Sequence, residues 1–178
     1  MMRTLIVAVT LLAAAPAAAQ SRLPDVIFVP TPQEVVDDML RLAGVKNGDV
    51  LYDLGSGDGR IPITAAKRYG VRGVGIDIDP DRVTEALENA KRAGVTKLVQ
   101  FRLDDIFMAD FREATVITLY LLPELNVKLR PRLLAELKPG TRIVSHQFDM
   151  GDWRPEKKLE TNGRVVYFWT VPDPKKKR

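Results

Sequence analysis

The fold of this chain is decided by one stretch, Val50-Leu51-Tyr52-Asp53-Leu54-Gly55-Ser56-Gly57-Asp58-Gly59-Arg60. The segment 50–54 is short and mostly apolar, as expected of a central parallel strand that is covered on both faces. Three glycines at alternate positions then allow the backbone to turn sharply and leave no side chain between it and a ligand. The segment 61–69 combines helix-forming residues with apolar spacing, so the first N–H groups of that helix would face the space over the loop. We therefore predict a strand, a glycine-rich turn and a helix, with a ligand bound over the turn.

Two familiar nucleotide-binding loops are similar to this stretch without matching it. A dinucleotide-binding loop has the pattern G-x-G-x-x-G, whereas the glycines here follow G-x-G-x-G. A Walker loop requires Gly-Lys-Ser or Gly-Lys-Thr, which the stretch lacks. Asp53 lies two residues before the first glycine, so the full pattern is D-x-G-x-G-x-G. The position of the third glycine disfavours dinucleotide binding.

A second acidic residue follows at a distance that indicates a ribose site. Residues 73–77, Gly-Val-Gly-Ile-Asp, have the pattern of a second strand that ends in a carboxylate. Asp77 lies 20 residues after Gly57, which is the separation at which an acidic side chain meets a ribose in this architecture. A carboxylate accepts hydrogen bonds from both ribose hydroxyls, and charged acceptors form the stronger bonds. We therefore predict that Asp77 binds a ribose.

The rest of the chain alternates helices with strands and ends in a hairpin. Pro32 opens a predicted helix that Thr31 caps, with Glu34 in the capping-box position and an end near Gly44. Asn162-Gly163 between two β-patterned runs is the strongest short-range hairpin signal. Further helices are predicted over residues 80–93 and 125–137, and further strands over residues 98–101, 114–120, 141–145, 157–160 and 165–171. This order predicts a three-layer α/β domain.

The first residues of the chain have the pattern of a secretory signal peptide. Residues 1–19 carry one positive charge, an apolar run and a small-residue end, with cleavage expected before Gln20. The alternatives are an uncleaved membrane anchor and a misassigned start codon. The remainder, about 159 residues, suits one domain with a good core, which we place at residues 20–174. We therefore expect a periplasmic or secreted location, or alternatively a membrane-anchored one.

The charge of the chain is concentrated in its tail. The formal charge of +4 becomes −1 for the body when Arg3 and the four basic residues 175–178 are set aside. This tail is either a solvated terminus or a contact for anionic lipid or nucleic acid. The chain has no cysteine and a single histidine, and its carboxylates show no metal-binding loop spacing, so we predict no metal site.

Together these motifs resemble the class I S-adenosylmethionine (SAM)-dependent methyltransferases. The pattern D-x-G-x-G-x-G resembles motif I of that family, and Asp77 follows at the matching distance. The resemblance covers nearly the whole mature chain. It implies a Rossmann-like three-layer sandwich with a mostly parallel seven-stranded sheet and an antiparallel C-terminal hairpin. It also implies S-adenosyl-L-methionine as cofactor and S-adenosyl-L-homocysteine (SAH) as product.

The same resemblance implies the residues that bind the cofactor. In the family an acidic residue after the third strand bonds the adenine amino group, and Asp105 before Ile106 best fits that place. The alternative is that Asp104 and Asp105 are solvated or capping residues, as paired aspartates in loops often are. The implied cofactor-binding residues are Asp53, Gly55, Ser56, Gly57, Gly59, Asp77, Ile78, Asp105 and Ile106.

Three stretches are similar to the small protein-lysine methyltransferases, including the mitochondrial enzymes that modify the ATP synthase c-subunit. They are Phe28-Val29-Pro30-Thr31-Pro32, residues 53–60 and Tyr120-Leu121-Leu122-Pro123-Glu124-Leu125-Asn126. The core of residues 54–60 also resembles the histone methyltransferases of non-SET type. The resemblance implies N-methylation of a protein lysine. Apart from the basic tail, nothing in the sequence indicates a nucleic-acid surface, so we expect no nucleic-acid partner. The alternatives are a small-molecule methyltransferase and an exported SAM-binding protein that has lost catalysis.

The acceptor side is predicted from the residues after the fourth strand. No Asp/Asn-Pro-Pro-Tyr/Phe motif is present there, which disfavours an adenine-type or glutamine-type amide acceptor. Tyr120 and Glu124 occupy that place. We predict that Tyr120 lines the acceptor channel and that Glu124 orients an amine.

Four further side chains have two interpretations each. His146 is either a general base or a structural residue at a strand end. Phe148 and Trp153 either wall the substrate mouth or pack their loop against the sheet. Arg60 either binds the SAM carboxylate or pairs with Asp58.

Overall fold

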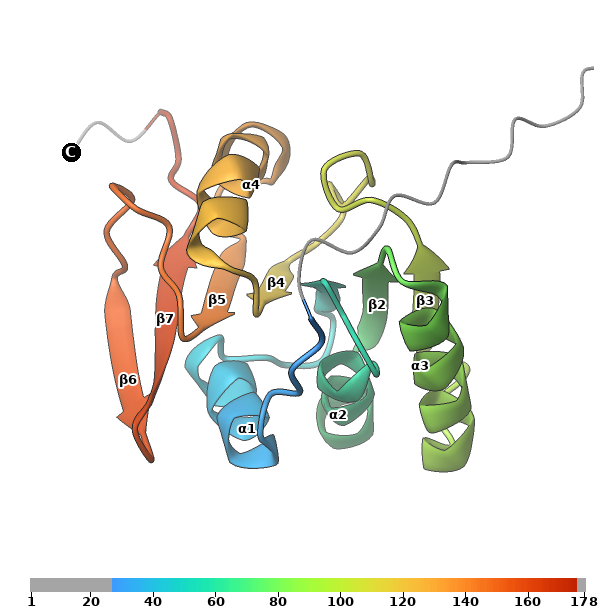
Figure 1. The fold of residues 1–178 in the computed structure, drawn as a ribbon. Coiled ribbons are helices and arrows are strands. Elements are labelled where there is room, and N and C mark those ends of the chain that lie inside the picture. The colour runs from blue at the N-terminus through green and yellow to red at the C-terminus, as the bar shows by residue number, and fades with distance from the viewer. Residues whose placement is uncertain (1–26, 176–178) are drawn as a thin grey trace, which may run out of the picture.

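Residues 27–175, described by a computed structural model, form one sheet with helices on both of its faces (Figure 1). The helices are α1 (Gln33–Leu42), α2 (Arg60–Tyr69), α3 (Pro80–Ala93) and α4 (Pro123–Glu136). The strands are β1 (Val50–Leu54), β2 (Arg72–Asp77), β3 (Val99–Leu103), β4 (Val116–Leu119), β5 (Arg142–His146), β6 (Lys157–Thr161) and β7 (Arg164–Thr170). The seven strands lie in the order β3-β2-β1-β4-β5-β7-β6. This arrangement confirms the predicted three-layer α/β fold.

Five neighbouring strands of the sheet run parallel, and only β7 runs against them, since β6 reverses once more beside β7. β1 pairs in parallel with β2 and β4, β2 with β3, and β4 with β5. β7 is antiparallel to both of its neighbours, β5 and β6. The chain builds one side of the sheet from β1 outward and then returns to start the other side at β4. A topological switch point therefore lies between β1 and β4, and ligands bind at the carboxyl ends of the strands at such a point.

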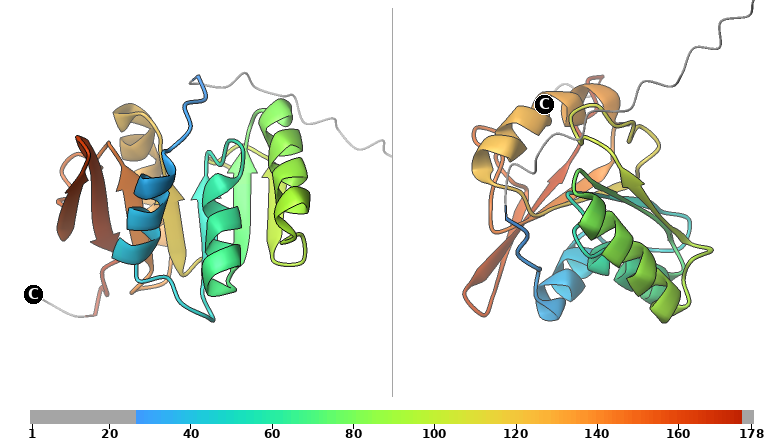
Figure 2. Two further views of the ribbon diagram at one scale, coloured as in Figure 1. Left: turned by 90° about the horizontal axis from the view of Figure 1, so that it is seen from below. Right: turned by 45° about the vertical axis from the view of Figure 1, so that its right-hand side comes forward.

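The helices cover the two faces of the sheet unequally. α1, α2 and α3 lie over one face and α4 over the other (Figure 2). Side chains alternate along β1, as strand geometry requires. Leu51 packs in a buried cluster with Val35 and Met39 of α1, while Leu54 joins a second cluster that contains Leu129 of α4. The central strand is thus buried on both sides, which explains its mostly apolar pattern.

Two local predictions are confirmed by the backbone. Asn162 and Gly163 have φ angles of 50° and 73°, as the two central residues of a type I′ hairpin turn require. Asp79 caps α3, because its carboxylate accepts a hydrogen bond of 2.8 Å from the N–H of Asp81. Pro80 then occupies the first turn of the helix, where its missing N–H costs little.

The predicted cap of the first helix is wrong. Pro32 is the N-cap of α1, and no side chain caps this end. The hydroxyl of Thr31 instead lies 3.2 Å from the Nδ1 atom of His146, on β5. A tertiary partner has therefore displaced the local capping box, because a buried imidazole also needs a hydrogen-bond partner.

Some element ends also differ from their predicted positions. α4 begins at Pro123, two residues before the predicted start, and it contains Pro131 without being interrupted. β3 continues to Leu103, and β4 is confined to Val116–Leu119. The predicted leader, residues 1–19, and residues 176–178 of the tail lie outside the described residues. Within residues 27–175, no helix has the length and apolar character needed to cross a membrane.

Candidate cofactor and acceptor site

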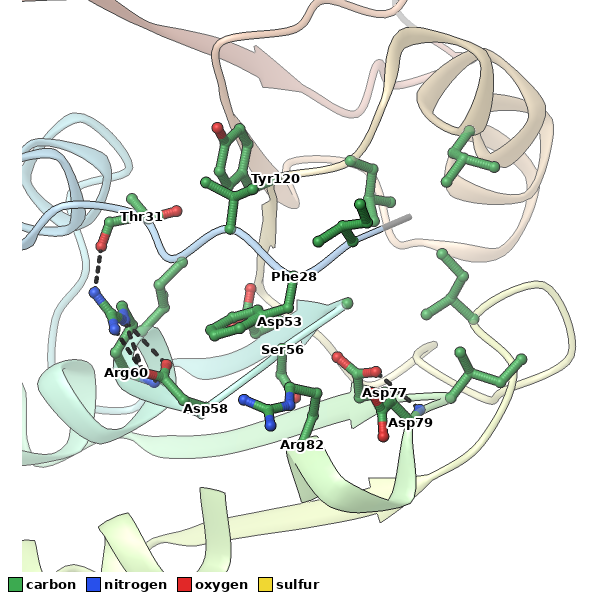
Figure 3. Close-up of a pocket in the computed structure, with 18 of the residues that line it drawn as sticks. Phe28, Thr31, Asp53, Ser56, Asp58, Arg60, Asp77, Asp79, Arg82 and Tyr120 are labelled. Atoms are coloured by element: carbon green, nitrogen blue, oxygen red, sulfur yellow. Dashed lines mark hydrogen bonds and ion pairs between the residues drawn. The ribbon is translucent and has the colours of Figure 1, made fainter. Parts of the chain in front are cut away.

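A cavity of about 770 Å³ opens at the carboxyl ends of the central strands (Figure 3). Its walls come from the N-terminal segment 27–31, the loop after β1, the end of β2, and the residues that follow β3 and β4. The predicted site residues that line it are Asp53, Gly55, Ser56, Asp77, Ile78, Asp105, Ile106 and Tyr120. The switch point of the sheet thus brings together residues that are far apart in the sequence.

The glycine-rich loop turns back onto the neighbouring strand. The N–H groups of Gly55 and Ser56 both donate to the carbonyl oxygen of Ile76, at 2.8 and 3.0 Å. The Ser56 hydroxyl is buried and has no hydrogen-bond partner among the described residues. A buried hydroxyl without a partner is costly, so this atom is suited to bond a ligand in the cavity.

The carboxylate of Asp77 is oriented by two backbone groups. One oxygen, Oδ2, accepts a hydrogen bond of 2.7 Å from the N–H of Gly57, and Oδ1 accepts one of 3.0 Å from the N–H of Asp79. These bonds connect the end of β2 to the glycine-rich loop. A carboxylate keeps further acceptor positions when two are used, so Asp77 can still receive ribose hydroxyls.

Gly57 and Gly59 shape the loop without lining the cavity. Both have positive φ angles, 51° and 77°. A β-carbon at position 57 would overlap the ring of Phe28, and one at position 59 would lie 2.5 Å from the Cζ atom of Phe101. Both positions therefore need glycine for two reasons, the backbone conformation and the close approach of an aromatic ring.

Asp53 is a buried carboxyl group at the floor of the cavity. Only 2% of its surface is exposed, and the Thr118 hydroxyl donates a hydrogen bond of 2.7 Å to its Oδ1 atom. Burial, against the lowering effect of the Thr118 hydrogen bond and together with the charges of Asp77 and Asp58, raises the pKa of Asp53 to about 8. The ligand-free protein therefore holds a proton on this group near neutral pH.

The charges around the cavity favour a cationic ligand. Besides the protonated Asp53, its lining includes four aspartates and two arginines, namely Asp58, Asp77, Asp79, Asp105, Arg60 and Arg82. Arg60 pairs with Asp58, because its Nε atom lies 2.9 Å from Oδ1. This contact agrees with one of the two interpretations of Arg60. Because the charge of Arg60 is balanced by Asp58, the net charge of the cavity lining stays negative.

The segment 27–31 crosses the cavity opening and is fixed at both of its ends (Figure 3). The ring of Phe28 packs on Gly57, and the guanidinium of Arg82 lies 5.0 Å from its centroid. At the other end, the Nη1 atom of Arg60 donates a hydrogen bond of 2.8 Å to the carbonyl oxygen of Thr31. The sequence patterns indicated no role for this segment in the site, and they did not indicate Arg82.

A second, smaller cavity of about 160 Å³ adjoins the first. It shares four of its six lining residues with the larger cavity; the six are Ile27, Val29, Tyr120, Leu121, Leu122 and Phe148. No charged side chain is among them. Tyr120 stands at the junction, with its ring stacked on that of Phe148 at 6.3 Å between centroids. The placement of Phe148 agrees with the interpretation that it walls the substrate mouth.

His146 lies behind Tyr120 and lines neither cavity. It is fully buried, its ring centroid is 4.0 Å from that of Tyr120, and its Nε2 atom has no partner among the described residues. Burial and, to a smaller extent, the charge of Arg164 lower the pKa of His146 to about 4. A neutral imidazole packed in this way agrees with the structural interpretation rather than with a general base.

Two other candidates also lie outside both cavities. Glu124 is exposed in the first turn of α4. Trp153 packs on Trp169 with ring centroids 6.0 Å apart, and its carbonyl oxygen accepts the indole N–H of Trp169 at 2.7 Å. Trp153 therefore packs its loop against the sheet, which is the second of its two interpretations.

Comparison with known proteins decides the family. Residues 53–157, more than half of the chain, match the family model described as the ANTKMT methyltransferase domain. The chain belongs to this methyltransferase family. The match begins at Asp53 and includes the glycine-rich loop, Asp77, Asp105 and Tyr120.

Relatives of this methyltransferase agree with that assignment. A protein-lysine N-methyltransferase of Saccharolobus islandicus is 43% identical over 160 residues, which cover 87% of this chain and 99% of the relative. The lysine N-methyltransferase of Mus musculus that is named for the ATP synthase c-subunit is 33% identical over 72% of this chain, which spans about half (51%) of that protein. A crystal structure described as an RNA methyltransferase from Salinibacter ruber with SAH is 60% identical. Its TM-score is 0.80, and the match covers 83% of this chain and 98% of the other.

The cofactor of the methyltransferase is therefore SAM, as predicted. The cavity fits this molecule on its own evidence, because its acidic lining matches a cation and the unpartnered Ser56 hydroxyl offers a polar contact. On the predicted assignments, Asp77 would hold the ribose and Asp105 the adenine. The side chain of Asp105 already accepts a hydrogen bond of 2.8 Å from the N–H of Phe107, which fixes its direction.

Proposed function

We propose that this methyltransferase methylates the side-chain amine of lysine in a protein. The small apolar cavity beside Tyr120 carries the proposal, since its walls suit the aliphatic stem of lysine. An ammonium group that enters such walls loses hydration, so its pKa falls and the neutral, nucleophilic amine is favoured. Two relatives named as protein-lysine methyltransferases support this choice.

The proposed reaction is a direct displacement. When bound, SAM supplies a methyl group on a positively charged sulfur. The lone pair of the amine forms the new N–C bond while the C–S bond breaks and its electrons return to sulfur, and the amine releases one proton to solvent. The protein contributes alignment, which alone lowers such barriers substantially. Tyr120 and Leu121 line both cavities and therefore stand where the two reactants would meet.

The experiment that tests the proposal supplies the full chain with radiolabelled SAM and a cell extract. The proposal predicts label in material that protease digests and nuclease does not, with methyllysine identified by mass spectrometry. An Asp77→Ala variant should bind neither SAM nor SAH in titration calorimetry and should transfer no label. SAH binding without label in any acceptor would instead favour the SAM-binding protein that has lost catalysis.

RNA is the second candidate acceptor. The observation that favours it is the 60% identity to the Salinibacter ruber structure, which is described as an RNA methyltransferase. One observation argues against RNA. Proteins that bind nucleic acid do so through positively charged surfaces, whereas this chain without its leader and tail has a formal charge of −1. Nuclease-sensitive label in the same experiment would replace lysine with RNA as the acceptor.

The predicted roles of Tyr120 and Glu124 are tested by the conservative variants Tyr120→Phe and Glu124→Gln. We expect Tyr120→Phe to lower kcat because the residue lies at the junction of the cavities. Glu124 lies outside both cavities, so its role requires that a bound acceptor protein reach the first turn of α4. Normal turnover in either variant would remove the corresponding residue from the mechanism.

We also propose that residues 1–19 are an export signal, since their composition matches one. N-terminal sequencing of the protein from fractionated cells would test this. A mature start at Gln20 in the periplasm or medium supports export, whereas an intact Met1 in the membrane fraction supports the anchor. Recovery of an intact chain from the cytosol would contradict both.

A further inference from the structure

Arg132 of α4 binds the backbone of the loop that follows β3. Its Nη1 atom donates a hydrogen bond of 3.0 Å to the carbonyl oxygen of Ile106, and Nη2 donates one of 2.9 Å to that of Ala109. The arginine side chain is only 24% exposed. These two bonds join α4 to a loop more than twenty residues earlier in the chain.

Glu136, one turn further along α4, orients this arginine. Its two carboxylate oxygens accept hydrogen bonds of 2.6 and 2.7 Å from Nε and Nη2 of Arg132. The guanidinium also lies 4.6 Å from the ring centroid of the buried Phe111. A bidentate ion pair fixes both the position and the plane of a guanidinium, so Arg132 has one available direction for its remaining donors.

The loop held in this way forms part of the cofactor cavity. Asp105, Ile106 and Phe107 all line that cavity. The loop also closes on itself, because the N–H groups of Met108 and Ala109 both donate to the carbonyl oxygen of Asp105 at 2.8 Å. Arg132 donates to the carbonyl oxygens of Ile106 and Ala109 in the same turn, so its bonds determine where the turn lies relative to the cavity.

We propose that Arg132, oriented by Glu136, is a positioning residue that fixes the cavity wall 105–107 for SAM. It touches neither cavity itself. Its effect reaches the cofactor through the loop backbone and is independent of which acceptor the enzyme methylates. Lysine cannot replace it, because one ammonium group cannot bond two carbonyls and a carboxylate in the fixed geometry of a guanidinium.

The test compares Arg132→Met and Arg132→Lys with a control in the same loop, Arg112→Gln. Arg112 pairs with Asp110 at the surface, where 68% of its side chain is exposed. We expect both Arg132 variants of the full chain to bind SAH at least about tenfold more weakly, since bonds from a charged donor are lost. The control should stay within about twofold of wild type, as surface substitutions usually do.

Two further measurements separate positioning from general stability. The KM for SAM should rise in the Arg132 variants while the kcat at saturating SAM changes little. Hydrogen exchange at residues 107–109 should become faster without SAH, with the amides of β1 and β4 unchanged, and SAH should restore the slow rate. These readouts report the loop itself rather than the whole fold.

Unchanged SAH affinity in Arg132→Lys would overturn the proposal, as would exchange that increases evenly over the sheet. If Arg132→Met does not fold, Arg132→Lys decides alone, because it keeps the charge and most of the stem. SAH binding requires no acceptor, so failure here leaves the proposed lysine acceptor untouched, and the reverse also holds.

Discussion

Asp53 links the stability of the ligand-free protein to pH. Its pKa is about 8 in the fold, against an ordinary value of 3.8, so between these values the folded chain keeps a proton that the unfolded chain has released. The free energy of unfolding therefore falls as pH rises through this window, by at most about 1.4 kcal/mol per pH unit, and levels above pH 8.

Asp53→Asn should remove this dependence while it keeps an acceptor for the Thr118 hydroxyl. We expect the variant to gain about 1 kcal/mol or more over wild type between pH 5 and pH 8, measured by urea denaturation without ligand. Asp152→Asn, at a fully solvated position whose side chain is 98% exposed, serves as the control. Parallel curves for wild type and Asp53→Asn would show that Asp53 ionises normally in the fold.

Gly57 illustrates a second constraint at the residue scale. Gly57→Ala and Gly70→Ala both place alanine at a positive φ, at 51° and 67°, so both should lose about 1–2 kcal/mol of stability. At position 57 the new β-carbon would overlap the ring of Phe28. At position 70 no atom lies within 4 Å of it. Calorimetry should show weaker SAH binding for Gly57→Ala alone, as Phe28 moves. Equal SAH affinity in the two variants would contradict a role for this contact.

At the scale of elements, the hydroxyl of Thr31 connects the segment 27–31 to His146 of β5. Thr31→Val should leave the buried imidazole of His146 without the only side-chain hydrogen bond observed for it among the described residues, at a cost of about 1–3 kcal/mol. Thr31→Ser keeps the hydroxyl and should stay close to wild type. Urea denaturation of the three proteins measures the difference, and equal losses in both variants would assign the effect to packing of the methyl group.

At the scale of the whole molecule, cofactor binding should stabilise the fold by mass action. SAH at one hundred times its Kd adds about 2.7 kcal/mol to the free energy of unfolding, which for a domain of this size raises Tm by roughly 5–11 °C. Asp77→Ala, which should not bind SAH, should melt at one temperature with and without it. A rise in Tm of that variant equal to that of wild type would show that Asp77 is not needed for binding.

The fold was predictable because its signals are local. The apolar run 50–54, the glycines after it and the Asn162-Gly163 turn each follow from the chemistry of neighbouring residues. The cap at Thr31 failed because its partner, His146, lies 115 residues away. The role of Arg132 gave no signal, since the loop atoms that it bonds are backbone carbonyl oxygens, which every sequence has. Glu124 was predicted to lie at the acceptor site because it follows β4 closely in the sequence. α4 begins at Pro123, however, and leaves Glu124 exposed.

The acidic lining of the cofactor cavity also bears on product release. Methyl transfer removes the positive charge from the sulfur, so the four lining aspartates other than the protonated Asp53 have less to attract in SAH. Coulomb energy in a partly buried site is larger than in water, and the loss of this attraction therefore weakens the binding of the product relative to that of the donor. The acidic lining that attracts SAM thus also favours release of SAH. Added salt should reduce the difference between the affinities of the cavity for SAM and for SAH.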